Sequence, residues 1–346
     1  MDSDSPSLLA KWLPSHRTHN VNSKIAKKIM MGLNMTEKEY RQILSMLRNR
    51  LNIVEKNLTE RKYENIDFSK VSTKAMLKYT NAYNKRMSKE YSEYKDSVKK
   101  GDAKINTEGL FAYEIIKKLL WGAKSDDELL DLMWNKQKDV LKGCNTNVLV
   151  MADTSGSMTC YGGIPYATSI GLALYTAERN TGIFKNHFLT FSSVPYLCEI
   201  KGNTIKEKVS NIPSIVANTD IDKAFDLILK TAKEQKLKQE ELPSHLLIIS
   251  DMEFDVGVYS GNGTNFDGWK NAFENEGYKL PIVIFWNVAG STRGMPATKF
   301  DNDVAMISGF STNILENLLT LDEYTPTNVM LEKLSIYLEM LKIDKN

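Results

Sequence analysis

The stretch that decides the fold is Val148-Leu149-Val150-Met151-Ala152-Asp153-Thr154-Ser155-Gly156-Ser157-Met158. Its first five residues are all apolar, which is typical of a strand buried on both faces of a parallel sheet. An aspartate and two alternate serines follow directly, in a loop that contains a glycine. The stretch therefore predicts a buried strand whose carboxyl end presents oxygen-bearing side chains.

Apolar runs of strand length recur after this stretch and alternate with helical patterns. The strand-like runs are Phe188–Phe191, Leu246–Ile249, Ile282–Trp286 and, more weakly, Val304–Ile307. The helical patterns are Ile164–Arg179, Ile221–Glu234 and Phe266–Glu276. Strands and helices that alternate at this spacing predict an α/β fold with a doubly wound, mostly parallel sheet. In such a sheet, ligands bind outside the carboxyl ends of the strands.

Five side chains with oxygen atoms stand where this fold would bring them together. Asp153, Ser155 and Ser157 follow the first strand, Thr219 opens a helix, and Asp251 ends a later strand. Oxygen atoms that point in one direction are what a hard divalent cation requires, so the pattern predicts a site for Mg²⁺ or Mn²⁺. The alternative is a metal-free loop, because serine and aspartate also hydrogen-bond the backbone around them.

The region before residue 144 has helical hydrophobic spacing almost throughout. Thr36-Glu37-Lys38-Glu39 predicts a capping box and therefore a helix that begins after Thr36. Further helices are expected over residues 79–99, 106–121 and 125–141. Tyr83, Tyr91 and Tyr94 recur at helical spacing in the first of these, which favours a core or a helix interface over base stacking. We predict a helical region over residues 1–143, disordered over residues 1–10, and an α/β domain over residues 144–346.

Charge is distributed unevenly along the chain, although the total is only +2. Residues 1–143 contain 28 Lys and Arg against 19 Asp and Glu, and the remainder contains 17 against 24. The basic helical region permits an anionic partner such as RNA. It equally permits solvated helix faces and attraction between the two halves of the chain.

The order Asp-x-Ser-x-Ser at residues 153–157, followed by Thr219 and Asp251, resembles the metal-ion-dependent adhesion site of von Willebrand factor A domains. The resemblance implies that Ser155 and Ser157 contact Mg²⁺ directly and that Thr219 does so when a ligand is bound. Asp153 and Asp251 would act through water or by hydrogen-bonding the direct ligands. A metal held mainly by neutral hydroxyls keeps much of its charge and favours an Asp or Glu from a protein partner. The function implied is a non-enzymatic, Mg²⁺-dependent protein-interaction module.

Other motifs resemble the family called domain of unknown function 2828. They are Lys11-Trp12-Leu13-Pro14, Asp67-Phe68-Ser69-Lys70-Val71, Lys74-Ala75-Met76, Lys99-Lys100-Gly101, Ser250-Asp251-Met252-Glu253-Phe254-Asp255, Phe285-Trp286-Asn287 and Ser308-Gly309-Phe310-Ser311. The family joins a helical N-terminal region to an A-type domain, as the Ro autoantigen and related ring-shaped RNA-binding proteins do. The helical half contains no Ro-specific motif, so this likeness of architecture does not imply RNA binding.

Four further polar side chains follow strand ends and are candidates for flanking a ligand. Glu253 and Asp255 come shortly after Asp251, where many A domains have Asp-Gly, and would bind metal themselves or pair with basic partner residues. Asn287 and Arg293 belong to the loop that follows the apolar run ending at Trp286. A polar loop with two glycines is usually only a loop, and that alternative stays open.

An enzyme is the third class of function that the sequence allows. The four histidines are His16, His19, His187 and His245. None is adjacent to Ser155 or Ser157, and neither serine lies in a Gly-x-Ser-x-Gly elbow. The chain also has no Walker A loop and no dinucleotide-binding glycine fingerprint. Metal-assisted hydrolysis by Asp153 and Asp251 is therefore the weakest of the three hypotheses, after protein recognition and RNA binding.

Composition sets the remaining bounds, with 42% apolar and 25% charged residues in 346, as in an ordinary globular protein of about two domains. No apolar run approaches the roughly 18–20 residues of a membrane span, and residues 1–10 do not form a signal peptide. Cys144, Cys160 and Cys198 form neither a disulfide framework nor a metal knuckle. We therefore expect an intracellular, cytoplasmic protein with no membrane partner.

Overall fold

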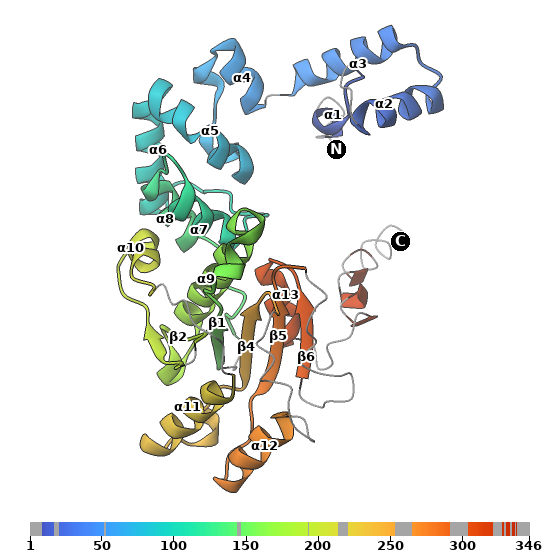
Figure 1. Ribbon diagram of the computed structural model, residues 1–346. Helices are drawn as coiled ribbons and strands as arrows, with labels where there is room; N and C mark the ends of the chain where they lie inside the picture. Colours follow the sequence, from blue (N-terminus) through green and yellow to red (C-terminus); the bar gives the residue numbers. More distant parts are fainter. Residues whose placement is uncertain are drawn as a thin grey trace, which may run out of the picture. The chain divides into compact units, whose positions relative to one another are not determined.

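The computed structural model describes residues 9–16, 21–51, 53–143, 147–192, 194–213, 221–252, 265–290 and 304–320, with scattered positions between 327 and 337. The chain divides into two compact units, Met1–Asn106 and Thr107–Asn346. Figure 1 shows the helices and strands of each unit. Helices α7 (Ala112–Trp121) and α8 (Asp127–Asn135) belong to the predicted helical region, yet they pack within the unit that contains the sheet.

The first unit is built from helices in its described part. They are α1 (Leu9–Trp12), α2 (Val21–Gly32), α3 (Glu37–Arg50), α4 (Val54–Glu60), α5 (Thr73–Arg86) and α6 (Ser88–Lys100). The capping box predicted at the start of α3 is confirmed. The Thr36 hydroxyl accepts from the Glu39 amide at 3.3 Å, and the Glu39 carboxylate accepts from the Thr36 amide at 2.8 Å.

A cluster of aromatic rings forms the core around α5 and α6. The Phe68 ring lies 5.2 Å from the rings of Tyr83 and Tyr91 and 5.3 Å from that of Tyr94, centroid to centroid. All three tyrosines are buried, so the interpretation of this stripe as core is confirmed. The single helix expected over residues 79–99 is wrong, because the backbone leaves helical geometry at Met87 and divides it into α5 and α6.

The second unit contains a six-stranded, mostly parallel sheet, which confirms the predicted α/β class (Figure 1). Its strands are β1 (Val148–Ala152), β2 (His187–Thr190), β3 (Leu197–Glu199), β4 (His245–Ser250), β5 (Ile282–Asn287) and β6 (Val304–Ser308). Their order across the sheet is β3-β2-β1-β4-β5-β6, and only β3 runs antiparallel to its neighbour. The short strand β3 was not predicted, because three residues are too few to show a period.

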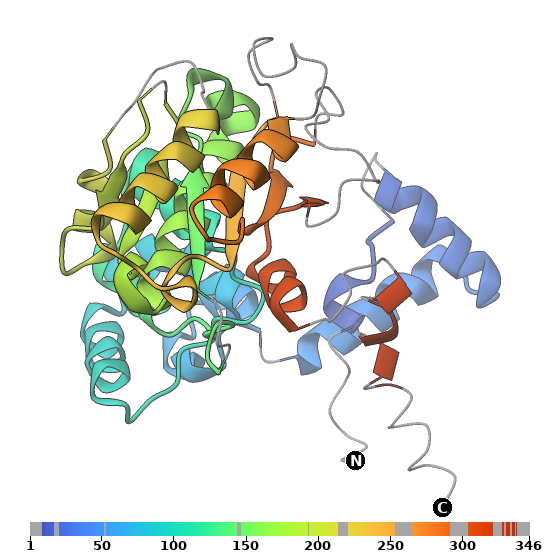
Figure 2. The ribbon, with the colours of Figure 1, turned by 90° about the horizontal axis from the view of Figure 1, so that it is seen from below.

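Helices pack against the sheet, whose central strand β1 is apolar and buried at all five positions. Side chains such as Leu149, Ile248 and Phe285 share one core with α11 (Ile221–Glu234) and α12 (Asn265–Asn275). Figure 2 shows these two helices side by side over that face of the sheet. Helix α9 (Cys160–Arg179) packs against β1 and β2. Two further helices of this unit are α10 (Ile205–Ser210) and α13 (Thr312–Thr320).

Helices α7 and α9 pack closely at Gly171. A Cβ added at Gly171 of α9 would lie 3.1 Å from the backbone of Ala112 in α7. The segment that leads into β1 is also held by α9, because the Val140 amide donates to the Tyr175 hydroxyl at 3.0 Å. Among the helices that the structure describes, none is both long and apolar enough to cross a membrane.

Candidate metal centre

The carboxyl ends of the neighbouring strands β1 and β4 bring two predicted carboxylates to one edge of the sheet. The strands are parallel and in register from Val148 opposite His245 to Ala152 opposite Ile249. The pairing extends one step further, since the Asp153 amide donates to the Ile249 carbonyl at 3.0 Å. Asp153 and Asp251 therefore leave the sheet at the same edge, as the sequence predicts for a pair of adjacent parallel strands.

The Asp153 carboxylate is fixed through both of its oxygens. Its Oδ1 accepts from the Ser155 amide at 2.8 Å, and its Oδ2 accepts from the Ser250 hydroxyl at 2.7 Å. The Asp153 side chain is almost fully buried, with a relative exposure of 1%. Because both oxygens have a donor, the carboxylate is held in one orientation before any ligand arrives.

Ser250 links the two carboxylates, and sequence reasoning gave it no role of its own. Its hydroxyl lies 2.7 Å from Asp153 Oδ2 and 3.5 Å from Asp251 Oδ1, and it accepts from the Met252 amide at 3.1 Å. Ser250 is completely buried, and Asp251 has a relative exposure of 5%. A serine immediately before the second aspartate, at the end of a buried strand, was the signal that could have identified it.

Burial raises the pKa of the Asp153 carboxyl above its ordinary value of 3.8. Hydrogen bonds from Ser155 and Ser250 lower this pKa, while the negative charge of Asp251 raises it again. Burial is the largest of these effects, so the charged form is disfavoured in the folded chain. A divalent cation near the two carboxylates would reverse that balance, because it stabilises the ionised form.

The serine hydroxyls lie on the more exposed side of the same loop. Ser155 Oγ and Ser157 Oγ are 3.1 Å apart, with Ser155 half-buried and Ser157 exposed. A short 3-10 turn, Gly156–Thr159, follows Ser155 and is closed by a bond of 2.7 Å from the Thr159 hydroxyl to the Gly156 carbonyl. The two hydroxyls are therefore accessible to an ion or ligand outside the sheet edge, with Asp153 buried behind them.

The backbone after this loop takes an unusual course that the sequence analysis did not predict. Tyr161, Gly162 and Gly163 all have left-handed φ angles, of 52°, 68° and 74°, before the regular part of α9 begins. A Cβ at Gly163 would lie 2.4 Å from the Trp121 ring, so a glycine is needed there. The Tyr161 side chain, beside the loop in sequence, is exposed. The pair Gly162-Gly163 was the available signal.

The structure describes only part of the predicted residue set. Asp153, Ser155, Ser157 and Asp251 are connected by the contacts described above. Thr219, Glu253, Asp255 and Arg293 lie outside the described residues, as does Cys144. Asn287 is described, and its Oδ1 accepts from the amides of Ala289 and Gly290 at 3.0 Å each. These bonds show that Asn287 shapes the loop after β5.

The other polar candidates lie away from this edge or make no metal cluster. His187 and His245 are the first residues of β2 and β4, so they stand at the amino ends of their strands. Cys160 is exposed and Cys198 is buried, and both are free thiols. Within the described ranges, no group of three or more His, Cys, Asp or Glu side chains is placed to hold a metal.

The described donor set fits a hard cation in its chemistry. It consists of two carboxylates and two hydroxyls, all oxygen ligands, which suit Mg²⁺ or Mn²⁺ better than a soft metal. Two protein carboxylates together with waters are a usual number for Mg²⁺, which keeps several of its waters. Asp153 already uses both oxygens in hydrogen bonds, which fits a role through water rather than direct coordination.

Sequence comparisons divide the chain near its middle. Residues 147–336 match the family described as Domain of unknown function (DUF7788), and residues 2–144 match Domain of unknown function (DUF2828). The predicted likeness to family 2828 is thus confirmed for the helical region, whereas the α/β region matches a separate family.

One relative is similar to almost the whole chain, and two solved structures are similar to about half of it. "Uncharacterized protein L728" of Acanthamoeba polyphaga mimivirus is 31% identical over 352 residues, covering 96% of this chain and 61% of that protein. Two structures of proximal thread matrix protein 1 from the mussel byssus match at 16% identity with TM-scores of 0.31 and 0.32. They cover 51% of this chain and 47% and 46% of theirs.

Proposed function

The chain belongs to the family described as Domain of unknown function (DUF7788). We propose that its α/β unit is a non-enzymatic, Mg²⁺-dependent protein-interaction module. The unit is of the doubly wound, von Willebrand factor A type in this proposal. The metal, held by a metal-ion-dependent adhesion site at the carboxyl ends of β1 and β4, recognises an Asp or Glu of a partner protein.

One observation supports this proposal above the others. Two buried carboxylates, Asp153 and Asp251, are joined through the Ser250 hydroxyl behind the accessible hydroxyls of Ser155 and Ser157. Placing two negative charges side by side in a buried setting is unfavourable unless something positive compensates for them. A cation that binds on the hydroxyl side would supply the compensation.

The chemistry of the donors indicates the class of ligand. Ser155 and Ser157 are neutral, and Asp153 is already hydrogen-bonded through both oxygens. A cation bound through hydroxyls and water therefore keeps most of its positive charge toward the solvent. A carboxylate from another protein is the natural ligand for such a cation.

A binding role is also favoured over hydrolysis by what surrounds the serines. The two described histidines of this unit, His187 and His245, begin β2 and β4. Ser155 and Ser157 follow the carboxyl end of β1, so the histidines lie at the opposite edge of the parallel strands. A serine nucleophile needs a base within hydrogen-bonding reach. In the described part of the site, the hydroxyls of Ser155 and Ser157 lie 3.1 Å apart, and the Asp153 carboxylate accepts from the Ser155 amide.

The proposal is tested by selecting peptides from a random displayed library on the immobilised chain in millimolar Mg²⁺ and eluting with EDTA. We expect the eluted peptides to contain an essential Asp or Glu, and to lose binding when it is replaced by Ala. Asp153→Ala should bind none of them while its circular dichroism spectrum stays folded. Peptides that bind equally well in EDTA, or to Asp153→Ala, would contradict the proposal.

A second variant tests the role assigned to Thr219. If this threonine joins the metal only when a ligand is bound, Thr219→Ala should weaken capture of the selected peptides more than it weakens binding of the metal alone. Calorimetry of Mn²⁺ and of peptide with the same preparation compares the two losses. Equal losses would contradict this role while leaving the metal site itself in place.

A further inference from the structure

A polar pocket lies on the first unit, between α3 and the loop that follows α1. Its volume is about 360 Å³, within the range of small-ligand sites. Six of its seven lining residues are polar, and none of them is acidic. The polar ones are Ser15, His16, Arg41, Ser45, Arg48 and Asn49. A pocket with two guanidinium groups and no carboxylate in its lining is suited to an anion.

The pocket follows from the spacing of residues along α3. Arg41, Ser45, Arg48 and Asn49 recur at steps of four, three and one, which places them along one side of the helix. Leu44, on the floor of the pocket, is buried in a small core with Ala26, Met30 and Tyr40. The same helix thus builds the core with one face and the pocket with another.

The loop that closes the pocket is tied to α3 by two side chains. Arg48 donates to the Leu13 carbonyl at 2.6 Å and to the Ser15 hydroxyl at 3.0 Å. The Tyr40 hydroxyl donates to the Pro14 carbonyl at 2.9 Å. The walls are therefore held in place by bonds within the protein, and Arg48 has a structural part in them.

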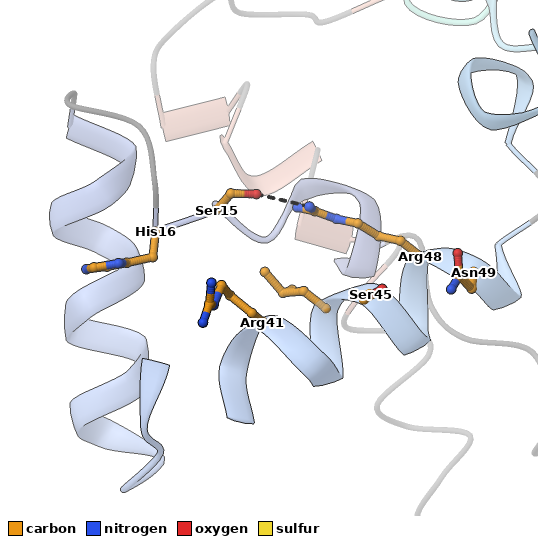
Figure 3. Close-up of a pocket in the computed structure, with 7 residues that line it drawn as sticks. Ser15, His16, Arg41, Ser45, Arg48 and Asn49 are labelled. Carbon is orange, nitrogen blue, oxygen red and sulfur yellow. Dashed lines mark hydrogen bonds between the residues drawn. The ribbon is translucent and has the colours of Figure 1, made fainter. Parts of the chain in front are cut away.

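Arg41 is the charged side chain of the pocket that is available to contact a ligand. Figure 3 shows its guanidinium beside His16 and Ser15, reaching from α3 toward the space between them. Over the residues that the structure describes, the Arg41 side chain has neither a hydrogen-bond acceptor nor an ion-pair partner. His16, by contrast, is paired through Nδ1 with the Glu37 carboxylate at 3.1 Å. Arg41 thus brings a full positive charge to the pocket.

The segment around the pocket is the most basic part of the chain. Residues 9–51 contain nine Lys and Arg and two acids, a net charge of +7 in a chain whose total is +2. Both acids are engaged inside the segment, Glu39 in the capping box and Glu37 with His16. Lys24, Lys27 and Lys28 of α2 are exposed. Such a concentration of charge attracts a polyanion rather than a single small ion.

We propose that this pocket binds a backbone phosphate of single-stranded nucleic acid, with Arg41 as its principal contact. Phosphate oxygens accept from the planar guanidinium fork and from the hydroxyls around it. The exposed lysines of α2 supply the diffuse attraction that a phosphodiester chain experiences. Trp12, three residues before Ser15 and 74% exposed, offers an aromatic face for an unpaired base.

Fluorescence anisotropy of a labelled, mixed-sequence, single-stranded RNA with the full chain tests this proposal. EDTA is present throughout, so that the metal centre makes no contribution. Arg41→Ala should weaken binding about tenfold, as expected for loss of a charged hydrogen bond. The matched control is Lys38→Ala, which removes the same charge from an exposed site on α3 outside the pocket and should weaken binding about twofold or less.

Salt dependence gives an independent reading of the same contact. The slope of log Kd against log salt concentration should become shallower by about 0.7 in Arg41→Ala, the value for one single-strand phosphate. Folding is not expected to change, since Arg41 holds no described residue in place. Circular dichroism of each variant checks this.

Four results would overturn the proposal. The first is equal weakening by Arg41→Ala and Lys38→Ala, which would mean diffuse attraction without a pocket contact. The second is no binding of RNA by the wild type even at low salt. The third is binding of AMP or inorganic phosphate as tightly as RNA, which would assign the pocket to a small phosphorylated ligand. The fourth is tighter binding of a phosphoserine peptide than of RNA, which would assign it to a phosphoprotein.

Discussion

The metal centre of the second unit and the pocket of the first unit hold their charged side chains in opposite ways. Asp153 is buried, and both of its oxygens accept hydrogen bonds from Ser155 and Ser250. Arg41 is exposed and, within the described chain, has no partner. The carboxylates are oriented by the fold itself, whereas the guanidinium is left to be oriented by a ligand.

This difference shows how two charged sites of one chain are suited to different ligands. A buried, hydrogen-bonded carboxylate pair loses little side-chain freedom on binding, which suits a small cation that demands fixed geometry. An exposed arginine in a basic segment tolerates several positions of a phosphate, which suits a flexible polyanion. Substitutions at the two sites should therefore differ in how far they change stability and how far they change binding.

The largest loss of stability is expected from Ser250→Ala. The change removes the donor to Asp153 Oδ2 and the acceptor of the Met252 amide, both in a fully buried position. Leaving these two groups unsatisfied should lower the free energy of unfolding by about 2–4 kcal/mol. Hydrogen exchange of peptides covering β1 and β4 measures this loss of stability locally. A local measurement is needed because a chain of two units need not unfold in a single two-state transition.

Ser308→Ala is the control for this variant. Ser308 ends β6 at the same edge of the sheet but is exposed, so its loss should change stability by less than about 0.5 kcal/mol. Equal effects of the two serine substitutions would show that the Ser250 hydroxyl does not organise the carboxylates.

In the basic unit, Arg48→Ala should reduce stability and Arg41→Ala should not. Arg48 holds the Leu13 carbonyl and the Ser15 hydroxyl, and losing two bonds from a half-buried charge should destabilise α1–α3 by about 2 kcal/mol. Arg41→Ala should stay within about 0.5 kcal/mol of the wild type. Hydrogen exchange across α3 measures both. Equal destabilisation by the two variants would remove the distinction between a structural and a ligand-facing arginine.

A smaller effect is expected from Asn287→Ala. Its Oδ1 accepts from the Ala289 and Gly290 amides, and the loss of such a loop cap should reduce stability by about 1 kcal/mol. Asn287→Asp keeps the acceptor and should restore most of this loss. Affinity for Mn²⁺, measured by calorimetry, should stay unchanged in both variants. A marked fall in Mn²⁺ affinity would show that Asn287 does flank the metal.

The smallest change in stability, with the opposite sign, is expected from Asp153→Asn in the absence of metal. Burial raises the pKa of Asp153, so its charge destabilises the folded chain at neutral pH, and the neutral amide should raise the melting temperature in EDTA. The advantage of the variant should shrink as the pH falls toward 3.8, because the wild-type carboxyl then takes up a proton more readily in the folded chain.

Added Mg²⁺ should stabilise the wild type and leave Asp153→Asn unchanged. Thermal melts at several pH values, with and without Mg²⁺, measure both effects. A variant that melts below the wild type at neutral pH in EDTA would show that hydrogen bonding at Asp153 outweighs the cost of its burial.

The strands and their carboxyl-end residues were predictable because a strand that is buried on both faces has a continuous run of apolar residues in the sequence. A strand such as β1 must be apolar at every position, and the residue that follows it must lie at the sheet edge. The placement of Asp153 and Asp251 at one edge of the sheet follows from this, whereas the adjacency of β1 and β4 was not predicted. The positions of Thr219, Glu253, Asp255 and Arg293 stay predictions, since they lie outside the described residues.

Other features of the fold depend on contacts and backbone angles that do not produce a periodic pattern in the sequence. The break at Met87 and the left-handed turn at Tyr161 are features of local backbone geometry, and at the second the Trp121 ring leaves no room for a Cβ on Gly163. The basic pocket forms where Arg48 and Tyr40 of α3 hydrogen-bond the loop after α1, which lies 26 or more residues earlier in the sequence. Charge counting indicated a basic region but could not locate the pocket within it.

Calorimetric titration of Mn²⁺ and Mg²⁺ into the wild type and Asp153→Ala shows whether the ends of β1 and β4 form a working metal centre. We predict saturable binding to the wild type and none to the variant, with both folded by circular dichroism. Unchanged affinity for Mn²⁺ and Mg²⁺ in folded Asp153→Ala, or no saturable binding of either metal to the wild type, would show that these residues do not form a metal centre.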